Sequence, residues 1–407
     1  MSEEMSKDWR EQEELKKLKE YLVKDFDKAI DSFVELSNKA KMIKLTEELI
    51  EIGEQILDDV NDERRGKIIG TLGNLCYNLG KFKEAEKYYE EALKFYIKLA
   101  KKDESYMKYV AGVLNNLGNL YYATGKPTEA EKAFRDALII RQDINDKEGL
   151  ATTLSCLGLL YSSIADYEKA KEYYERALLI RMELHKNDVK SLYNLGMVLN
   201  NLGTIYNALN DTEKAEESYK KAIETYKDLL SREERVEDML CGAMNNLASL
   251  YLEVGKTEEA EELLNEIKKY ESLLPPDLKV KVIFNNARII EKKDVEKAAK
   301  EYLRAGSMAF VLFVTYGMKT INFIYCFEKV EEIGEGEIKG DAEIMRRAML
   351  KAYFGLEKDK EIKRVECSKR GKAILDALKG SFKLEVKDDI DLAAYIIANE
   401  VKKKSGF

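Results

Sequence analysis

The chain has 407 residues, enough for two or three ordinary domains, and carries 68 Lys+Arg against 76 Asp+Glu. The net charge of -8 argues against a protein whose main task is binding nucleic acid, because such proteins usually present a basic face. With 3 prolines, 45% hydrophobic residues and 35% charged residues, the composition indicates a soluble, mostly helical chain with few breaks.

The five cysteines lie far apart and form no C-x-x-C pair, which favours isolated, reduced thiols in a cytoplasmic protein. The N-terminal segment is charged where a signal peptide needs an apolar stretch. The most apolar segment, residues 305–327, is interrupted by Lys319 and Asn322, and its unbroken core is too short to span a bilayer. We therefore expect a cytoplasmic chain without a membrane segment.

Residues 1–62 are expected to form N-terminal helices that act as a degenerate repeat or cap. Ala29 and Phe33 suggest one helix pair, and a further helix is predicted over residues 42–60. This region is acidic and regular, and it shows no convincing helix-turn-helix of the kind that DNA-binding regulators carry.

The segment 63–270 contains one pattern five times. Each copy has Leu, a small residue and a Tyr, then an Ala about nine residues later, then an aromatic residue or Leu, and finally Ala or Ile. The copies are Leu72, Gly73, Tyr77, Ala85, Tyr89, Ala92; Leu117, Gly118, Tyr121, Ala130, Phe134, Ala137; Leu157, Gly158, Tyr161, Ala170, Tyr174, Ala177; Leu202, Gly203, Tyr206, Ala215, Tyr219, Ala222; and Leu247, Ala248, Tyr251, Ala260, Leu264, Ile267.

Each copy predicts two helices joined by a tight turn. The turn signals between the two helices are Gly80-Lys81, Gly125-Lys126, Ala165-Asp166, Asn210-Asp211 and Gly255-Lys256. A small residue at a fixed helical position suits a close approach of two helices, where a larger side chain would overpack. Such a unit cannot bury its apolar face alone, so we expect the units to stack.

This arrangement of small, large and aromatic residues resembles the tetratricopeptide repeat (TPR). The usual TPR unit has about 34 residues, whereas the small residue recurs here at 73, 118, 158, 203 and 248, at spacings of 45, 40, 45 and 45. Long units of this kind resemble those of kinesin light chain and of Pins-like scaffold proteins. The resemblance implies an all-α fold, a right-handed superhelix (α-solenoid) of antiparallel helix pairs.

Two degenerate TPR-like units are expected over residues 271–356. Asn285 and Asn286 followed by Ala298, Tyr302 and Ala305 predict the sixth unit, and residues 320–354 predict a seventh. Residues 357–407 are expected to form C-terminal capping helices.

The sequence argues against catalysis. The single histidine, His185, lies near a predicted helix end, so multi-histidine metal sites are excluded and little remains for Ser-His or Cys-His catalysis. The Gly255-Lys256-Thr257 run imitates the end of a phosphate loop, but Leu250 stands where that loop needs Gly. We expect no enzyme activity, no catalytic residue, no metal and no cofactor.

The free face of the first helix in each unit is the most informative feature of the sequence. When the small residue of each unit is numbered 8, positions 2, 5, 6, 9 and 13 fall opposite the packed side, at about 100° per residue. We call this face the inner wall; two of its 25 residues are charged, in a chain that is 35% charged. Its residues are Lys67, Gly70, Thr71, Asn74, Asn78; Gly112, Asn115, Asn116, Asn119, Ala123; Thr152, Ser155, Cys156, Leu159, Ser163; Met197, Asn200, Asn201, Thr204, Ala208; and Gly242, Asn245, Asn246, Ser249, Glu253.

The TPR resemblance implies that this wall lines a concave groove, in which asparagines hydrogen-bond the backbone of a partner's peptide segment. By position, this role is assigned to five residues, Asn74, Asn116, Asn119, Asn201 and Asn246. The alternative is that small and neutral residues here only pack successive helices, with asparagines bonded to each other. Peptide binding predicts that a double Asn201→Ala, Asn246→Ala variant loses its partner with little change in melting temperature.

A TPR of the chaperone-tail type would instead use Lys and Arg on this wall to hold a terminal carboxylate, and Lys67 is the one residue suited to that role.

The leading functional hypothesis is a non-enzymatic interaction scaffold or adaptor that binds a protein or peptide partner. One alternative is a peptide-sensing regulatory module. Another is a homodimer formed through the apolar stretch 308–316. Neither nucleic acid nor a membrane is expected as a ligand.

Overall fold

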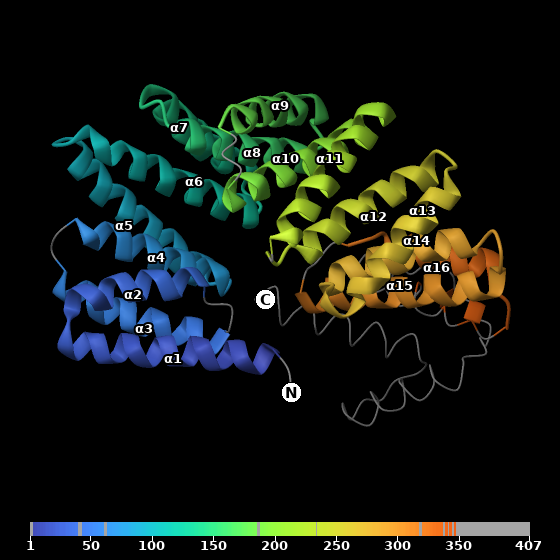
Figure 1. The fold of residues 1–407 in the computed structure, drawn as a ribbon, viewed down its shortest axis with the longest axis horizontal. Coiled ribbons are helices and arrows are strands. Elements are labelled where there is room, and N and C mark those ends of the chain that lie inside the picture. The colour runs from blue at the N-terminus through green and yellow to red at the C-terminus, as the bar shows by residue number, and fades with distance from the viewer. Residues whose placement is uncertain are drawn as a thin grey trace, which may run out of the picture. The chain divides into compact units, whose positions relative to one another are not determined.

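The computed structural model describes residues 3–39, 43–60, 63–184, 188–232, 234–316, 320–336, 338–340, 342–343 and 346. Over these residues the chain is all-α, with no β-strand, and consecutive helices form antiparallel pairs (Figure 1). The predicted fold class, an α-solenoid of helix pairs, is confirmed. None of the helices in these ranges combines the length and apolar character that crossing a bilayer requires.

The chain divides into two compact units, Met1–Ser191 and Leu192–Phe407, and each is described by itself. The helices of the first unit are α1 (Glu3–Lys24), α2 (Phe26–Lys39), α3 (Ile43–Asp59), α4 (Arg64–Asn78), α5 (Phe82–Ala100), the 3₁₀ turn η1 (Glu104–Tyr106), α6 (Met107–Ala123), α7 (Pro127–Asp143), α8 (Lys147–Ser163) and α9 (Tyr167–Glu183). The helix expected over 42–60 corresponds to α3. The inner wall of this unit lies on α4, α6 and α8.

The helix α10 (Val189–Ala208) begins at the end of the first unit and lies mostly in the second. The other helices of the second unit are α11 (Thr212–Ser231), α12 (Glu237–Glu253), α13 (Thr257–Ile267), the 3₁₀ segment η2 (Lys268–Leu273), α14 (Pro276–Ile290), α15 (Val295–Tyr316) and α16 (Phe323–Ile333). The expected sixth repeat corresponds to α14 and α15, in which Ala298, Tyr302 and Ala305 are fully buried. The expected C-terminal helices, 357–407, lie outside the described residues.

Glycine and aromatic residues interlock within each pair of helices. A Cβ atom on Gly73 would lie 2.6 Å from the Tyr89 ring, and one on Gly118 would lie 2.5 Å from the Phe134 ring. Gly158 faces Tyr174 in the same way, at 2.8 Å. The ring therefore fills the space that the missing side chain leaves, which explains the small-then-aromatic pattern of the sequence.

The five predicted turns all contain a residue in the left-handed backbone region. Gly125 has φ 72°, as expected of a residue without a Cβ, but Ala165 has φ 60° and Asn210 also has φ 60°. In the third and fourth repeats the residue after the turn also caps the next helix, as where the Asp166 carboxylate accepts from the Lys169 backbone amide at 3.3 Å. The turn chemistry thus makes each pair of helices antiparallel.

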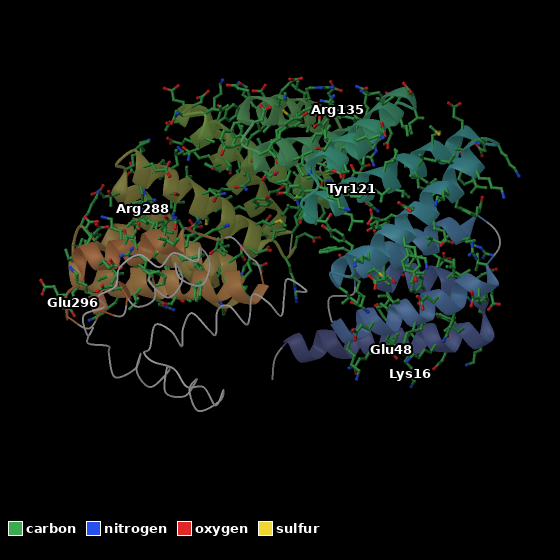
Figure 2. All side chains as sticks on the ribbon, turned by 180° about the vertical axis from the view of Figure 1, so that it is seen from behind. Lys16, Glu48, Tyr121, Arg135, Arg288 and Glu296 are labelled. Atoms are coloured by element: carbon green, nitrogen blue, oxygen red, sulfur yellow. The ribbon has the colours of Figure 1, made fainter. Side chains whose placement is uncertain are left out.

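Successive repeats are joined by tyrosines at their first helices. The Tyr161 hydroxyl of α8 donates to Glu131 of α7 at 2.7 Å and accepts from Arg135 at 3.1 Å (Arg135 is labelled in Figure 2). In the second unit the Tyr251 hydroxyl of α12 donates to Glu216 of α11 at 3.0 Å. These bonds tie the first helix of one repeat to the second helix of the repeat before it.

The apolar stretch 308–316, which the sequence offered as a homodimer contact, lies in α15. Ala309, Phe310 and Leu312 are buried in the second unit, and the Phe310 ring meets Phe323 of α16 with centroids 5.6 Å apart. These three side chains stabilise the fold of this chain and are therefore not available to a second copy.

Candidate functional site

The five asparagines predicted to bind a partner all lie on first helices of repeats, and all are half-buried. Asn74 lies on α4, Asn116 and Asn119 lie on α6, Asn201 lies on α10, and Asn246 lies on α12. The first three belong to the first unit and the other two to the second. Their hydrogen bonds separate them into two groups.

In the first unit, Asn74 and Asn116 are bonded to each other. The Asn116 amide nitrogen donates to the Asn74 amide oxygen at 3.2 Å, across successive repeats. The same oxygen accepts from the hydroxyl of Tyr89 at 2.8 Å. Both lone pairs of Asn74 are therefore used, while Asn116 retains a free amide oxygen within the described residues.

A second hydrogen bond between successive repeats of the first unit involves a more deeply buried asparagine. Asn115 is 6% exposed, and its amide oxygen accepts from the hydroxyl of Thr153 on α8 at 3.1 Å. Its nitrogen lies 3.7 Å from the sulfur of Cys156. Position 5 of this repeat therefore faces the next repeat and not a groove, which corrects the expectation of an open wall at that position.

The second unit repeats this pairing. The Asn246 amide nitrogen donates to the amide oxygen of Asn200 at 3.1 Å, so α12 is bonded to α10. Asn285 of α14 donates to the amide oxygen of Asn245 at 3.0 Å, and both of these residues are 3% exposed. The bonding of asparagines between neighbouring repeats, which the packing alternative required, is thus part of the structure.

Asn119 and Asn201 differ from the other three. Within the described residues neither side chain makes a hydrogen bond, although each is half-buried on the inner wall. A half-buried amide without a protein partner keeps two donors and an acceptor for water or for a ligand. These two residues therefore fit the predicted role best, and the free groups of Asn116 and Asn246 can add to it.

Three inner-wall glycines have open space where a side chain would be. Gly70, Gly112 and Gly242 lie within helices, and a Cβ atom on any of them would meet nothing within 4 Å. Glycine inside a helix costs about 0.5–1 kcal/mol relative to alanine, and packing gives no reason for it here. Glycine at such positions lets another backbone approach closely.

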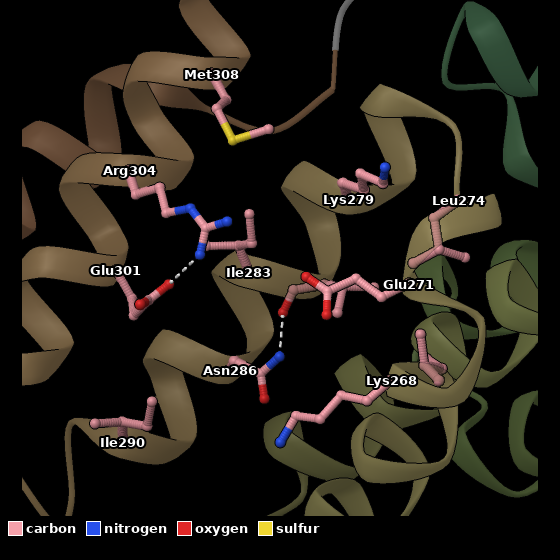
Figure 3. A pocket seen from close by; sticks show the side chains of 12 residues that line it. Lys268, Glu271, Leu274, Lys279, Ile283, Asn286, Ile290, Glu301, Arg304 and Met308 are labelled. Carbon is pink, nitrogen blue, oxygen red and sulfur yellow. Dashed lines mark hydrogen bonds and ion pairs between the residues drawn. The ribbon is translucent and has the colours of Figure 1, made fainter.

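The second unit also contains a pocket of about 230 Å³, lined by residues of α13, η2, α14 and α15 (Figure 3). Its lining includes Val282 and Ile283, and the side-chain nitrogen of Asn286 donates to the Val282 carbonyl at 3.0 Å. At its edge Arg304 pairs with Glu301 at 3.5 Å. The volume is below the roughly 300 Å³ at which ligand pockets begin, and six of its twelve lining residues are charged or polar.

The cysteines of the described chain are poor nucleophiles. Burial raises the pKa of the Cys76 thiol to about 11 and the pKa of Cys241 and Cys326 to about 12, so these thiols stay protonated. His185 lies outside the described residues. Among the residues that the structure describes, no group of three His, Cys, Asp or Glu is arranged to hold a metal ion.

Comparison with known families identifies the repeats. Four tetratricopeptide repeat profiles match the chain, at residues 67–98, 109–183, 197–229 and 240–267. All four fall within the segment 63–270 in which the sequence pattern recurs. No curated protein sequence matches the chain.

Solved structures share the fold at low sequence identity. A signal transduction ATPase with a tetratricopeptide repeat sensor, from Pyrococcus horikoshii, is 16% identical with a TM-score of 0.55, over 91% of this chain and 55% of that chain. The apo form of RapI is 15% identical with a TM-score of 0.54, over 93% of this chain and 98% of that chain.

Repeats of a putative kinesin light chain from Podosopora anserina are 18% identical over 52% of this chain and 98% of that chain. The TM-score of this match is 0.42.

Proposed function

The chain is a tetratricopeptide repeat protein, and we propose that it is a non-enzymatic scaffold or adaptor whose inner wall holds an extended or helical segment of a partner protein. The observation that carries this proposal is the combination of open helical glycines with unbonded asparagines on a nearly uncharged wall. Each feature costs stability or leaves a polar group without a protein partner, and a bound peptide segment would account for both.

The proposed binding follows from the chemistry of a peptide backbone. An extended segment presents a carbonyl and an N–H at every residue, and an asparagine amide can bond either group. Because Gly112 adds no side chain above α6, a backbone can pass close to Asn116, about one turn further along the helix, and to Asn119, about two turns further. In the second unit Gly242 stands before Asn246 in the same order. A peptide-sensing module would use the same wall, and the same variants would abolish its response.

Affinity capture from native lysate tests the proposal with the full chain. We expect a Gly112→Leu, Asn119→Ala variant to lose the partner that the wild type retains, because leucine fills the approach and alanine removes the amide. The matched control is Lys132→Leu, which adds a leucine to the exposed face of α7 in the same repeat. The melting temperature of each variant should equal or exceed that of the wild type, because none of the three substitutions removes a buried contact. Retention of the same partner by the inner-wall variant would refute the proposal.

A further inference from the structure

Two buried arginines stand at equivalent places in successive repeats. Counting four residues from the last Ala of the pattern, the first and fourth repeats carry Tyr96 and Tyr226, which are 5% and 2% exposed. The second and third repeats carry arginine at this place, Arg141 and Arg181, each 7% exposed. Where the first and fourth repeats bury an aromatic ring, these two bury a guanidinium group. Packing alone does not explain that choice, because burying a cation is unfavourable unless it is paired.

The environment of Arg141 supplies partners for its charge. One terminal nitrogen donates to the hydroxyl of Thr153 at 2.7 Å and also to the backbone carbonyl of Gly149. The carboxylate of Asp146 lies 3.9 Å from its Nε. Arg141 therefore joins α7 to the first turns of α8, and its role is structural.

The environment of Arg181 supplies fewer partners. Its Nη2 donates to the hydroxyl of Thr152 at 3.0 Å, and its Nε, like that of Arg141, is buried without a hydrogen-bond acceptor among the described residues. Within the same residues no carboxylate lies in ion-pair distance. The acid that acts on Arg181 through space is Glu148, which is already paired with Lys190. Burial lowers the pKa of the Arg181 guanidinium, as expected for a cation short of counter-charge.

The contact with Thr152 places the Arg181 guanidinium at the inner wall. Thr152 occupies position 2 on α8, the position that Gly112 occupies on α6, and Arg181 reaches it from α9. A segment lying along the wall of the first unit would therefore pass the one buried guanidinium there that lacks a carboxylate. The nearby charge of Glu148 disfavours a dianion such as phosphate, whereas a singly charged carboxylate can be accommodated.

We infer that Arg181, held at the wall by its bond to the Thr152 hydroxyl, binds a carboxylate of the partner segment, either an Asp or Glu side chain or a free C-terminus. The inference rests on the proposed function, because it assumes that a segment lies on the inner wall. It adds a chemical requirement that the asparagines do not impose, since an amide bonds any backbone. The partner segment would be selected by one acidic group at a fixed place.

An array of 12-residue random peptides tests the inference with the full chain as probe. Each peptide is present in four forms, with its acidic residues intact or changed to Asn and Gln, and with its C-terminus free or amidated. We expect the wild type to prefer one acidic form by about 10- to 100-fold, the range of a hydrogen bond to a charged group. An Arg181→Met variant should bind all four forms equally, with the affinity that the wild type has for the forms lacking the preferred carboxylate. The control Arg176→Met removes the same charge from the outer face of α9, where Arg176 pairs with Glu172, and should behave as the wild type.

The outcomes separate the two claims. If the wild type retains no peptide, the proposed function falls and the inference falls with it. If it retains peptides without preferring a carboxylate, or if Arg181→Met keeps the preference, only the inference is overturned. The two arms of the array show whether the carboxylate belongs to a side chain or to the C-terminus.

Thermal unfolding supplies a second readout. We expect Arg181→Met to melt at or above the wild-type temperature, because no ion pair is lost and Thr152 keeps its bond to the Glu148 carbonyl. A marked fall in melting temperature, together with an unchanged preference on the array, would make Arg181 a packing residue.

Discussion

Two glycines of α6, which lie six residues apart, should respond to substitution by alanine in opposite directions. Gly118 faces α7, where an added Cβ would lie 2.5 Å from the ring of Phe134, a side chain that is 1% exposed and enclosed. Gly112 faces the inner wall, where an added Cβ would meet nothing within 4 Å. Both residues are helical, so alanine gains the same helix propensity at either position, about 0.5–1 kcal/mol.

The magnitudes follow from these contacts. Overpacking a well-filled core costs about 1–3 kcal/mol, which exceeds the propensity gain, so Gly118→Ala should destabilise the unit by about 1–2 kcal/mol. Gly112→Ala has no overpacking term and should stabilise the unit by about 0.5–1 kcal/mol. The difference in unfolding free energy between the two variants therefore measures how tightly the glycine and the aromatic ring pack against each other.

Urea denaturation followed by circular dichroism is the first assay, with the transition midpoints compared at equal slope. Repeat arrays can unfold in parts, so hydrogen exchange of the α6 and α7 amides should be measured as a local free energy. If Gly112→Ala destabilised the protein as much as Gly118→Ala, the assignment of one glycine to packing and the other to an open wall would be refuted.

Three further changes test other parts of the structure. Ala165→Gly should stabilise the protein by about 0.5–1 kcal/mol, measured by urea midpoint, because alanine at φ 60° is strained and glycine is not. Asn74→Ala should cost about 1–3 kcal/mol, because two donors lose their acceptor, whereas Asn119→Ala should change the melting temperature little; equal effects would contradict the division of the asparagines. Hydrogen bonds from lysines and a tyrosine lower the Glu216 pKa from 4.5 to about 2, so its ionised form contributes stability above pH 4.5 that is lost as the pH falls towards 2. Glu216→Gln should therefore be less stable than the wild type at pH 7 and equal to it near pH 2, in melting scans across that range.

The fold could be predicted from the sequence because its steric requirements are visible in single residues. A glycine at position 8 with an aromatic residue sixteen positions later can be satisfied only by two helices in close contact, as Gly118 and Phe134 show. The turns could also be predicted from the sequence. This includes the turn at Ala165, because the following Asp166 is a helix-capping residue. These signals act within one repeat and need no knowledge of the angle between repeats.

The division among the asparagines could not be predicted in the same way. Whether Asn116 meets Asn74 depends on the rotation from one repeat to the next, which the spacing of residues in a chain does not give. The inner-wall prediction therefore assigned one role to five residues, while the structure divides them by their bonds. Arg181 was missed because it lies on a second helix, outside the face considered. The sequence did contain a signal for Arg181: four residues after the last Ala of the pattern, the second and third repeats have Arg, whereas the first and fourth have Tyr.

Photo-crosslinking from single sites tests the central claim most directly. The photoreactive residue p-benzoylphenylalanine would replace Leu159, which is 44% exposed at position 9 of α8, or Ile139, which is 55% exposed on the second helix α7. Both side chains are exposed and apolar, so the pair differs mainly in whether the probe lies on the inner wall. We predict that one partner crosslinks from the Leu159 position in native lysate and not from the Ile139 position. Crosslinking of that partner from Ile139 alone, or equally from both sites, would contradict binding at the inner wall.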